Sequence, residues 1–262
     1  MSDPLVLTRD EGTARIITLN RVEKRNAIDF ELGEAFARAI DEVAENKDIR
    51  TVIVNGAGKG FCAGVDFFAL GSVDLSGNAQ FRHVVKTLQA IPNKIARLEK
   101  PVIAVMHGFC IGLGLEMVLA CDVRIAEAGC RINIEEVRLG MIPDVGGSTR
   151  LVRTVGVPRA KELIMTGRTI DASVAETWGL VNQVVEEGEG LKAALGWHED
   201  FAKGSPSAVG LAKIVLDRAY DLDDNSSMIL EGMAQSTLIA SEDFKEGLAA
   251  RIEKRKPNWK GK

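Results

Sequence analysis

The sequence has few cysteines, shows no recognisable secretory signal and contains no long uncharged apolar run. Its four cysteines include no Cys-x-x-Cys pair, which argues against a disulfide framework or a zinc site and favours free buried thiols. The longest apolar stretch, residues 113–120, is interrupted by Glu116 and is too short to span a bilayer. The first residues lack a basic segment followed by an apolar one, so no signal peptide is visible. We therefore expect a cytoplasmic protein that does not enter a membrane.

An excess of basic charge is also missing. The chain has 33 basic and 37 acidic residues, for a net charge of −4. A nucleic-acid-binding protein usually has a basic surface. In the helix expected over residues 30–46, Arg38 is the only lysine or arginine. The charge pattern therefore argues against a nucleic-acid partner. The 46% apolar content and 262 residues suffice for one large packed domain or a domain with a small appendage.

Strands and helices alternate along the first part of the chain. Short apolar or β-branched runs predict strands at 5–8, 14–19, 51–55, 100–105 and 122–126. Apolar residues at helical spacing predict helices at 29–44, 78–98 and from about 113. This alternation indicates an α/β fold in which parallel strands are joined by right-handed crossovers.

From residue 157 the pattern becomes mainly helical, with one strand-like run at 180–185. The predicted helices are 158–165, 172–178, 191–203, 207–220, 226–240 and 242–254. We interpret residues 1–200 as a core that holds the functional site. Residues 201–262 are interpreted as a C-terminal helical region used for oligomerisation.

Three glycine-rich stretches are the most informative motifs. Each brings peptide N–H groups or a carboxylate to the end of a buried apolar element, and glycine allows a ligand to approach closely. The three stretches are GAGKGFCAGVD at 56–66, GFCIGLGLE at 108–116 and EVRLGMIPD at 136–144.

The first stretch has a competing interpretation. Residues 58–63 match the G-x-G-x-x-A pattern of a dinucleotide-binding turn. That pattern requires a second strand about twenty residues later, where this chain has a polar amphipathic helix instead. A Walker loop is excluded because Gly60, and not Ser or Thr, follows Lys59.

The second stretch combines a peptide donor and a carboxylate. Gly112 opens a helix whose first free N–H belongs to Leu113, and Glu116 lies one turn later on the same face. The helix is apolar nearly all round, so Glu116 requires a partner if it is charged. A structural ion pair with Arg124 or Arg131 is the alternative to a catalytic role.

The third stretch carries two carboxylates. Glu136 and Asp144 are separated by Gly140 and Pro143, and this spacing suggests a turn that lets both side chains reach one cavity. As an alternative, Asp144 caps the N-terminus of the next helix.

Taken together, the three stretches resemble the crotonase superfamily, the enoyl-CoA hydratase/isomerase family. The resemblance spans nearly the whole chain and implies a ββα superhelix core with an α-helical C-terminal part. Members stabilise the enolate of an acyl-CoA thioester. The resemblance makes the peptide N–H groups of Ala63 and Leu113 the oxyanion hole. Leu113 departs from the glycine usual at its position, and its side chain is expected to narrow or redirect the acyl pocket.

The resemblance also implies roles for the carboxylates. Glu116 and Glu136 match the two glutamates of family hydratases, and Asp144 matches the aspartate of several isomerases. The family's CoA-thioester dehalogenases carry a histidine whose place falls at about Gln89.

The loop RVEKRNAI at 21–28 resembles the family's loop along the pantetheine chain of CoA. The residues that the resemblance places against substrate or CoA are Lys24, Arg25, Ala27, Ala63, Gly64, Val65, Asp66 and Gly112. Family members form homotrimers that often pair into hexamers, as a dimer of trimers, and we expect the same here.

We therefore predict an enoyl-CoA hydratase that adds water across the 2,3 double bond of a 2-enoyl-CoA. The predicted enzyme uses no metal and no cofactor apart from the coenzyme A of its acyl-CoA thioester substrate. An enoyl-CoA isomerase (3,2-trans or 3,5/2,4-dienoyl) that uses Asp144 is the alternative. A third possibility, the RNA-binding branch of the family, is disfavoured by the acidic charge balance.

Overall fold

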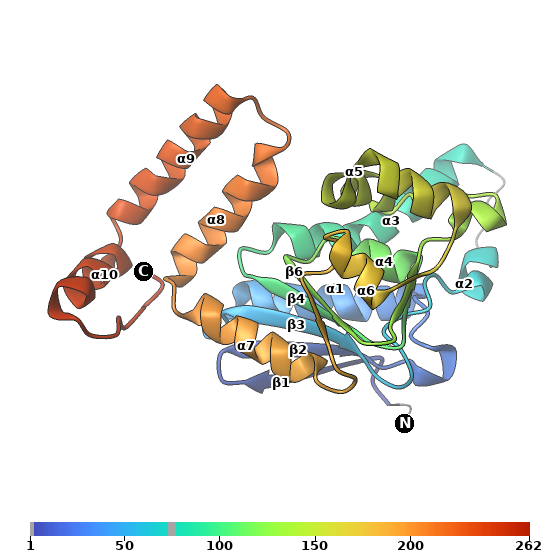
Figure 1. Cartoon of the computed structure of the whole chain (residues 1–262), viewed down its shortest axis with the longest axis horizontal. Coiled ribbons are helices and arrows are strands. Elements are labelled where there is room, and N and C mark those ends of the chain that lie inside the picture. The colour runs from blue at the N-terminus through green and yellow to red at the C-terminus, as the bar shows by residue number, and fades with distance from the viewer. Residues whose placement is uncertain (1–2, 73–76) are drawn as a thin grey trace.

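The computed structural model describes residues 3–72 and 77–262 and has an α/β fold. Its main sheet has six strands in the order β1-β2-β3-β4-β6-β9 (Figure 1). β1 and β2 form an antiparallel hairpin, and β2, β3, β4, β6 and β9 are mutually parallel, as the alternation predicted. The strands are β1 (Val6–Glu11), β2 (Ala14–Leu19), β3 (Thr51–Gly56), β4 (Val102–Met106), β6 (Val123–Glu127) and β9 (Gln183–Val185).

Helices cover both faces of this sheet, which explains why its central strands β3 and β4 are buried along nearly their whole length. All five residues of β4 are buried. Helix α1 (Phe30–Glu45) begins after Asp29, whose side chain accepts a hydrogen bond from the Leu32 N–H, as predicted for an N-cap. Helix α7 (Gly190–Ala202) packs on the other face against side chains such as Ile53 and Ile103.

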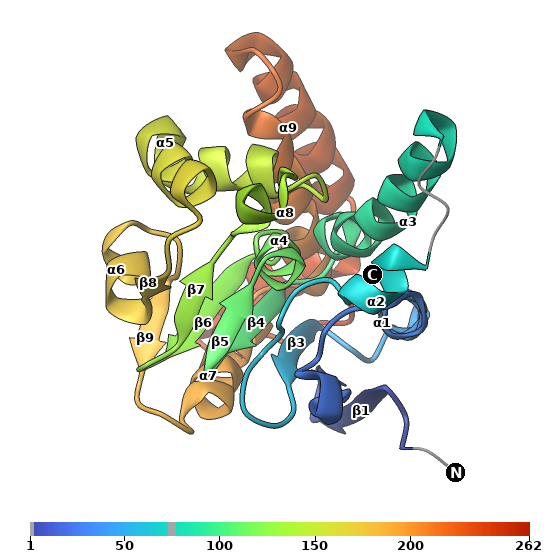
Figure 2. The ribbon, with the colours of Figure 1, turned by 90° about the vertical axis from the view of Figure 1, so that its right-hand side faces the viewer.

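A second, three-stranded sheet was not predicted. It has the order β5-β7-β8, with β5 (Phe109–Ile111), β7 (Arg131–Asn133) and β8 (Ile170–Asp171) (Figure 2). Strands of two or three residues are too short to show a period in the sequence. This sheet matters for the site, because β5 leads directly into helix α4 (Leu113–Val118) and β7 leads into the 3₁₀ helix η2 (Glu136–Leu139).

The remaining helices agree with the predicted ones except at α2, which was not predicted, and at α5. Helix α5 (Gly147–Thr166) begins eleven residues before the predicted start at 158, and Gly156 interrupts it with φ 77° just ahead of Pro158. The sequence pattern identified only the half after this kink. The other helices are α2 (Phe67–Gly71), α3 (Asn78–Arg97), α6 (Ala172–Thr177), α8 (Pro206–Ala219), α9 (Asp224–Ile239) and α10 (Glu242–Glu253).

Helices α8, α9 and α10 extend away from the sheet as an arm (Figure 1). The arm begins with α8 at Pro206. The core behind it contains the four cysteines, all free and buried, as predicted. Among residues 3–72 and 77–262, no helix combines the length and the apolar composition needed to cross a membrane.

Candidate active site

Three segments distant in sequence converge beside the start of α4. The loop after β3 is joined to β5, since the Ile111 N–H donates to the Cys62 carbonyl oxygen at 3.0 Å. The Gly112 N–H donates to the Asn133 carbonyl oxygen at 3.1 Å and so joins α4 to β7. These bonds bring the three glycine-rich stretches together, although each follows a different strand.

Glu116 is the most deeply buried carboxylate of this region, with 2% of its surface exposed. Its Oε1 accepts two hydrogen bonds of 2.8 Å, from the peptide N–H groups of Val145 and Gly147. The alternative that Glu116 forms an ion pair with Arg124 or Arg131 is wrong. Arg124 instead donates to the carbonyl oxygens of Leu180 and Cys121.

Glu136 approaches the same place from η2. An added Cβ on Gly112 would lie 2.7 Å from its Oε1, so this carboxylate rests against the residue that opens α4. Its Oε2 is buried and has no hydrogen-bond partner within the part of the chain that the structure describes. A buried polar atom without a partner is costly, and a water molecule or substrate atom would satisfy it.

Burial controls the protonation of both glutamates. Desolvation raises the pKa of Glu116 to about 7, and the charges of Glu136 and Asp144 add to the rise. The two N–H donors to Oε1 act in the opposite direction. Desolvation also raises the pKa of Glu136, assisted by the charges of Glu135 and Asp144. Two neighbouring carboxyl groups with raised pKa values suit a general acid and a general base.

Asp144 lies at the edge of the glutamate pair. It is half-buried, and desolvation raises its pKa. The alternative that it caps the next helix is wrong, because α5 begins at Gly147 with Gly146 as the N-cap residue and without a side-chain cap. The backbone of Asp144 is held instead, since Gln89 Nε2 donates to its carbonyl oxygen at 2.6 Å.

In the loop at 62–66, one of the two N–H groups expected to form the oxyanion hole already has an acceptor. The Ala63 N–H already donates to the Arg25 carbonyl oxygen at 3.1 Å, so it is not free to bind an oxyanion. Gly64 and Asp66 also donate, to Cys62 Sγ and to the Ile28 carbonyl oxygen. Within the described residues, the Val65 N–H has no acceptor.

The N–H of Leu113 is likewise without an acceptor among residues 3–72 and 77–262. An added Cβ on Gly64, the residue before Val65, would lie 3.7 Å from the Leu113 nitrogen, so the two free donors belong to adjoining segments. The Leu113 side chain is 3% exposed and belongs to the main hydrophobic core. Two neighbouring free N–H groups, one at a helix start, are the elements of an anion site.

Asp66, expected to contact substrate or CoA, has a structural role in this fold. Its carboxylate pairs with Arg21 Nη1 at 2.5 Å and caps α2 by accepting from the N–H groups of Phe68 and Ala69. These contacts lower its pKa, the hydrogen bond from Arg21 most of all. The carboxylate therefore fixes the loop, and its oxygens are already in use.

The predicted CoA residues Lys24 and Arg25 are exposed at the end of η1 (Val22–Lys24), and Ala27 follows them, half-buried. Lys24 Nζ lies 5.7 Å from the centre of the Phe68 ring. An exposed cation and an exposed aromatic ring therefore lie side by side, a combination suited to a phosphate and a base.

Asn26 was missed by the sequence analysis. It is fully buried with φ 56°, and its Nδ2 donates to the carbonyl oxygens of Ala57, Gly60 and Phe61. It thereby clamps the 21–28 loop to the glycine-rich stretch after β3. The sequence feature that could have identified it is an asparagine next to Arg25 in an expected turn, because asparagine adopts the left-handed backbone conformation more readily than most residues.

The dinucleotide-turn interpretation of residues 58–63 is wrong. A dinucleotide-binding turn opens directly into a helix, whereas here a loop continues to Asp66 and the short α2 begins only at Phe67. Among the described residues, no group of three His, Cys, Asp or Glu side chains is placed to hold a metal ion.

Comparison with known proteins is consistent with this geometry. The profile of the enoyl-CoA hydratase/isomerase family matches residues 9–262. The chain is 36% identical to enoyl-CoA hydratase domain-containing protein 2, mitochondrial, of Homo sapiens, over 97% of this chain and 87% of that protein. It is 35% identical to the short-chain-enoyl-CoA hydratase of Clostridium acetobutylicum, over 96% of this chain and 95% of that protein. The crystal structure of an enoyl-CoA hydratase from Bacillus anthracis superposes with a TM-score of 0.93 at 35% identity and covers 98% of this chain and 100% of that one.

Proposed function

Because the chain belongs to the enoyl-CoA hydratase/isomerase family, we propose that it is an enoyl-CoA hydratase. It adds water across the 2,3 double bond of a 2-enoyl-CoA. The observation that carries this proposal is the convergence of two glutamates, the buried Glu116 and the half-buried Glu136, on the start of α4. Hydration is the family reaction that needs two such groups at once.

The chemistry assigns one task to each carboxylate. Hydration forms a C–O bond at C3 and a C–H bond at C2, so a base must deprotonate the water while an acid supplies the C2 proton. Oε2 of Glu136 is free to hold the water. Glu116, with a pKa near 7, shares the proton with it. The base gains one proton from the water while the acid gives one to C2, so the pair keeps its total number of protons, and one proton must pass between the two carboxylates before the next turnover.

Negative charge that develops on the thioester oxygen needs donors that are free before substrate binds. We assign this oxyanion hole to the N–H groups of Val65 and Leu113, in place of the expected pair Ala63 and Leu113. Each donor of this type is worth roughly 3 kcal/mol of transition-state stabilisation. Ala63 and Gly64 then line the thioester, next to Gly112.

The proposed path of CoA follows the 21–28 loop. Lys24 and Arg25, which are exposed, meet the phosphates, and Ala27 lies along the pantetheine chain. The proposed reaction requires no group beyond the substrate's own coenzyme A. Turnover of a 2-enoyl-CoA by the purified protein, followed by identification of the 3-hydroxyacyl-CoA product, tests the proposal. No turnover of any 2-enoyl-CoA, from short to long chain, would contradict it.

A second activity, isomerisation of a 3-enoyl or dienoyl-CoA, is favoured by one specific observation. Asp144 is half-buried, has a raised pKa and is not used as a helix cap. Its structural contact is made by its backbone, which accepts from Gln89.

Asp144→Asn separates the two activities. The substitution keeps the backbone contact and the shape but removes the basicity. Hydration should stay within about tenfold of wild type, a change of under roughly 1.4 kcal/mol, and isomerisation should fall much further. If the wild type shows negligible hydration and a large isomerase rate that this substitution abolishes, the order of the two functions is reversed.

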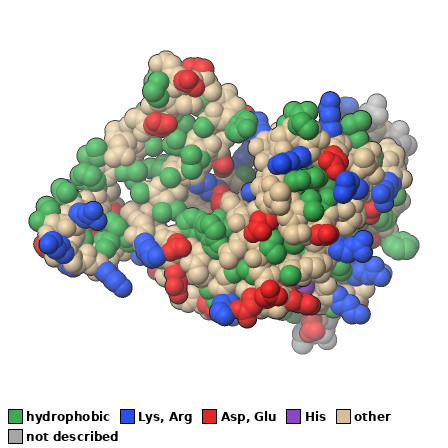
Figure 3. Space-filling model, viewed as in Figure 1, with side chains coloured by type: hydrophobic (Ala, Val, Ile, Leu, Met, Phe, Trp, Pro, Cys, Tyr) green, Lys and Arg blue, Asp and Glu red, His purple; other side chains and the backbone are tan. Residues whose placement is uncertain are grey.

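The proposed assembly is a homotrimer, alone or paired into a hexamer, built through residues 201–262. Helix α9 buries none of its residues, and Figure 3 shows apolar side chains exposed along the arm. Such a surface is typical of an oligomer interface. The most exposed apolar residues of the arm include Leu216, Tyr220, Met228, Met233, Leu248 and Ile252. Light scattering at micromolar concentration should give a trimer or hexamer mass, and a stable monomer would contradict the assembly.

A further inference from the structure

We propose that Arg150 is a positioning residue for Glu116. It anchors the turn at 144–147, and the peptide N–H groups of that turn hold the Glu116 carboxylate. The inference rests on the proposed function for its consequence in turnover, but the contacts that support it are independent of any activity.

Arg150 contacts the turn with both its backbone and its side chain. Its N–H donates to the Gly146 carbonyl oxygen at 2.8 Å. Its guanidinium folds back over Gly146, where an added Cβ would collide with Nη1. Gly146 joins Val145 to Gly147, the two residues whose N–H groups donate to Glu116 Oε1. The arginine therefore covers the peptide segment that fixes the carboxylate.

Helix α3 provides the fixed point. Arg150 Nη2 donates to Asn93 Oδ1 at 2.7 Å, and Gln89 Nε2 donates to the Asp144 carbonyl oxygen at 2.6 Å. Gln89 and Asn93 are four residues apart on α3 and so share one face of the helix. The turn is thus held to α3 at both of its ends, once directly and once through Arg150.

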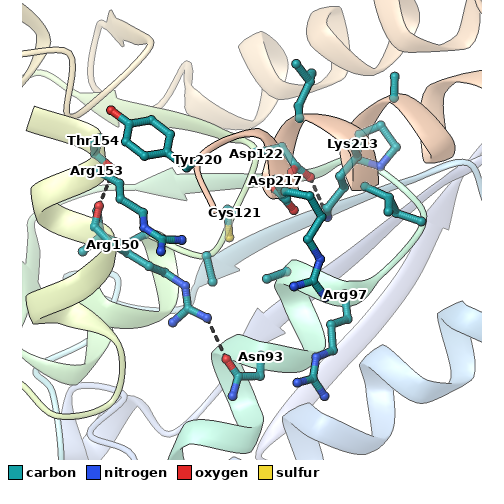
Figure 4. A pocket seen from close by; sticks show the side chains of 18 of the residues that line it. Asn93, Arg97, Cys121, Asp122, Arg150, Arg153, Thr154, Lys213, Asp217 and Tyr220 are labelled. Carbon is teal, nitrogen blue, oxygen red and sulfur yellow. Dashed lines mark hydrogen bonds and ion pairs between the residues drawn. The ribbon is translucent and has the colours of Figure 1, made fainter. Parts of the chain in front are cut away.

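Arg150 forms no ion pair with a carboxylate among the described residues. Figure 4 shows it beside Arg153, at the wall of a cavity of about 970 Å³ between α3, α5 and α8. In that wall Arg153 pairs with Asp221 at 2.6 Å and Lys213 pairs with Asp122 at 2.9 Å. Arg150 donates to the neutral amide of Asn93 and, within the described chain, has no carboxylate within 4.0 Å.

The charged groups around the pair determine the sign of the effect. Glu116 faces Glu136 from η2 and Asp144 from the loop, and both charges raise its pKa. Arg150 faces Arg153 on its own helix, Asp217 on α8 and Cys121 after α4, besides Glu116. Loss of Arg150 removes a nearby positive charge and loosens two N–H donors, and both changes favour protonated Glu116.

The test titrates Glu116 directly, by ¹³C NMR of the protein labelled at glutamate side-chain carboxyl carbons, with Glu116→Gln to assign the signal. Arg150→Ala should raise the Glu116 pKa by about half a unit or more, since both a charge and two hydrogen bonds are affected. Arg153→Ala is the matched control. It removes an arginine from the same helix and cavity wall, and it should leave the Glu116 titration unchanged.

A second variant covers the case in which Arg150→Ala does not fold. Asn93→Ala keeps the charge and cuts only the anchor to α3, so it should shift the pKa in the same direction by a smaller amount. In turnover, Arg150→Ala should lower kcat about tenfold or more with little change in KM, because the positioned group acts after binding.

The outcomes separate the two claims. Equal Glu116 titrations in wild type, Arg150→Ala and Asn93→Ala would overturn the positioning role, even if stability falls. A shifted titration in a protein without hydratase turnover would support the positioning role and reject the proposed function.

Discussion

Gly112 and Glu136 are in such close contact that an added Cβ on the glycine would lie 2.7 Å from the carboxylate oxygen Oε1. The glycine has φ 52° and ψ −122°, a conformation that side chains rarely adopt. The residue that opens α4 therefore sets the distance at which Glu136 stands from the start of that helix. Any side chain at position 112 would therefore displace this carboxylate.

Gly112→Ala should accordingly lower kcat by about 10²-fold or more, since displacement of a catalytic group by about 1 Å costs this much. Gly129→Ala is the matched control. Gly129 also has a positive φ, 82°, but an added Cβ there has nothing within 4 Å. The control places alanine at a positive φ without the clash, so equal loss of activity in both variants would contradict the role of the Gly112–Glu136 contact.

Replacement of single peptide bonds by esters tests the reassigned oxyanion donor. Incorporation of an α-hydroxy acid at Val65 replaces its N–H by an ester oxygen, and kcat should fall by about 10²- to 10³-fold. The same replacement at Ala63 removes the hydrogen bond to Arg25 and should cost about 1 kcal/mol of stability, with much smaller loss of kcat. A larger kcat loss at Ala63 than at Val65 would restore Ala63 as the donor.

The raised pKa of Glu116 predicts a pH-dependent stability. The folded-state pKa is about 7 against a usual 4.5, so between these values the native protein binds more protons than the unfolded chain. The free energy of unfolding should therefore fall as pH rises through this window. Glu116→Gln removes this dependence, and its stability relative to wild type should increase by up to about 3 kcal/mol between pH 5 and pH 8. Urea unfolding of both proteins across the range measures the difference, and a constant difference would contradict the buried-acid description.

The long elements could be predicted because each carries its own signal. The alternating pattern identified the parallel strands, and Asp29 marked the start of α1 with a side-chain cap. Strands β5, β7 and β8 could not be predicted, since segments of two or three residues have no measurable period. The first half of α5 was missed because Gly156 and Pro158 resemble a helix boundary, although the helix continues after a kink.

The candidate site was predictable in its carboxylates but not in its hydrogen bonds. Glu116 and Glu136 stood out because a charged group in an apolar or glycine-rich segment requires an explanation. Which N–H of the 62–66 loop is free depends on Arg25, a residue some forty positions earlier, whose carbonyl oxygen takes the Ala63 donor. The Asp66 carboxylate similarly forms an ion pair with Arg21, which belongs to another segment. Sequence patterns do not contain such pairings, because they arise only when the segments pack.

The central claim is that Glu116 and Glu136 share one proton and one water during hydration. It is tested most directly by the kcat for crotonyl-CoA hydration of Glu116→Gln and Glu136→Gln, each measured on protein shown to be folded and assembled like wild type. Glutamine keeps the shape of each side chain but cannot exchange a proton, so each variant should lose about 10²-fold or more in kcat. Rates close to wild type in both variants would contradict the account.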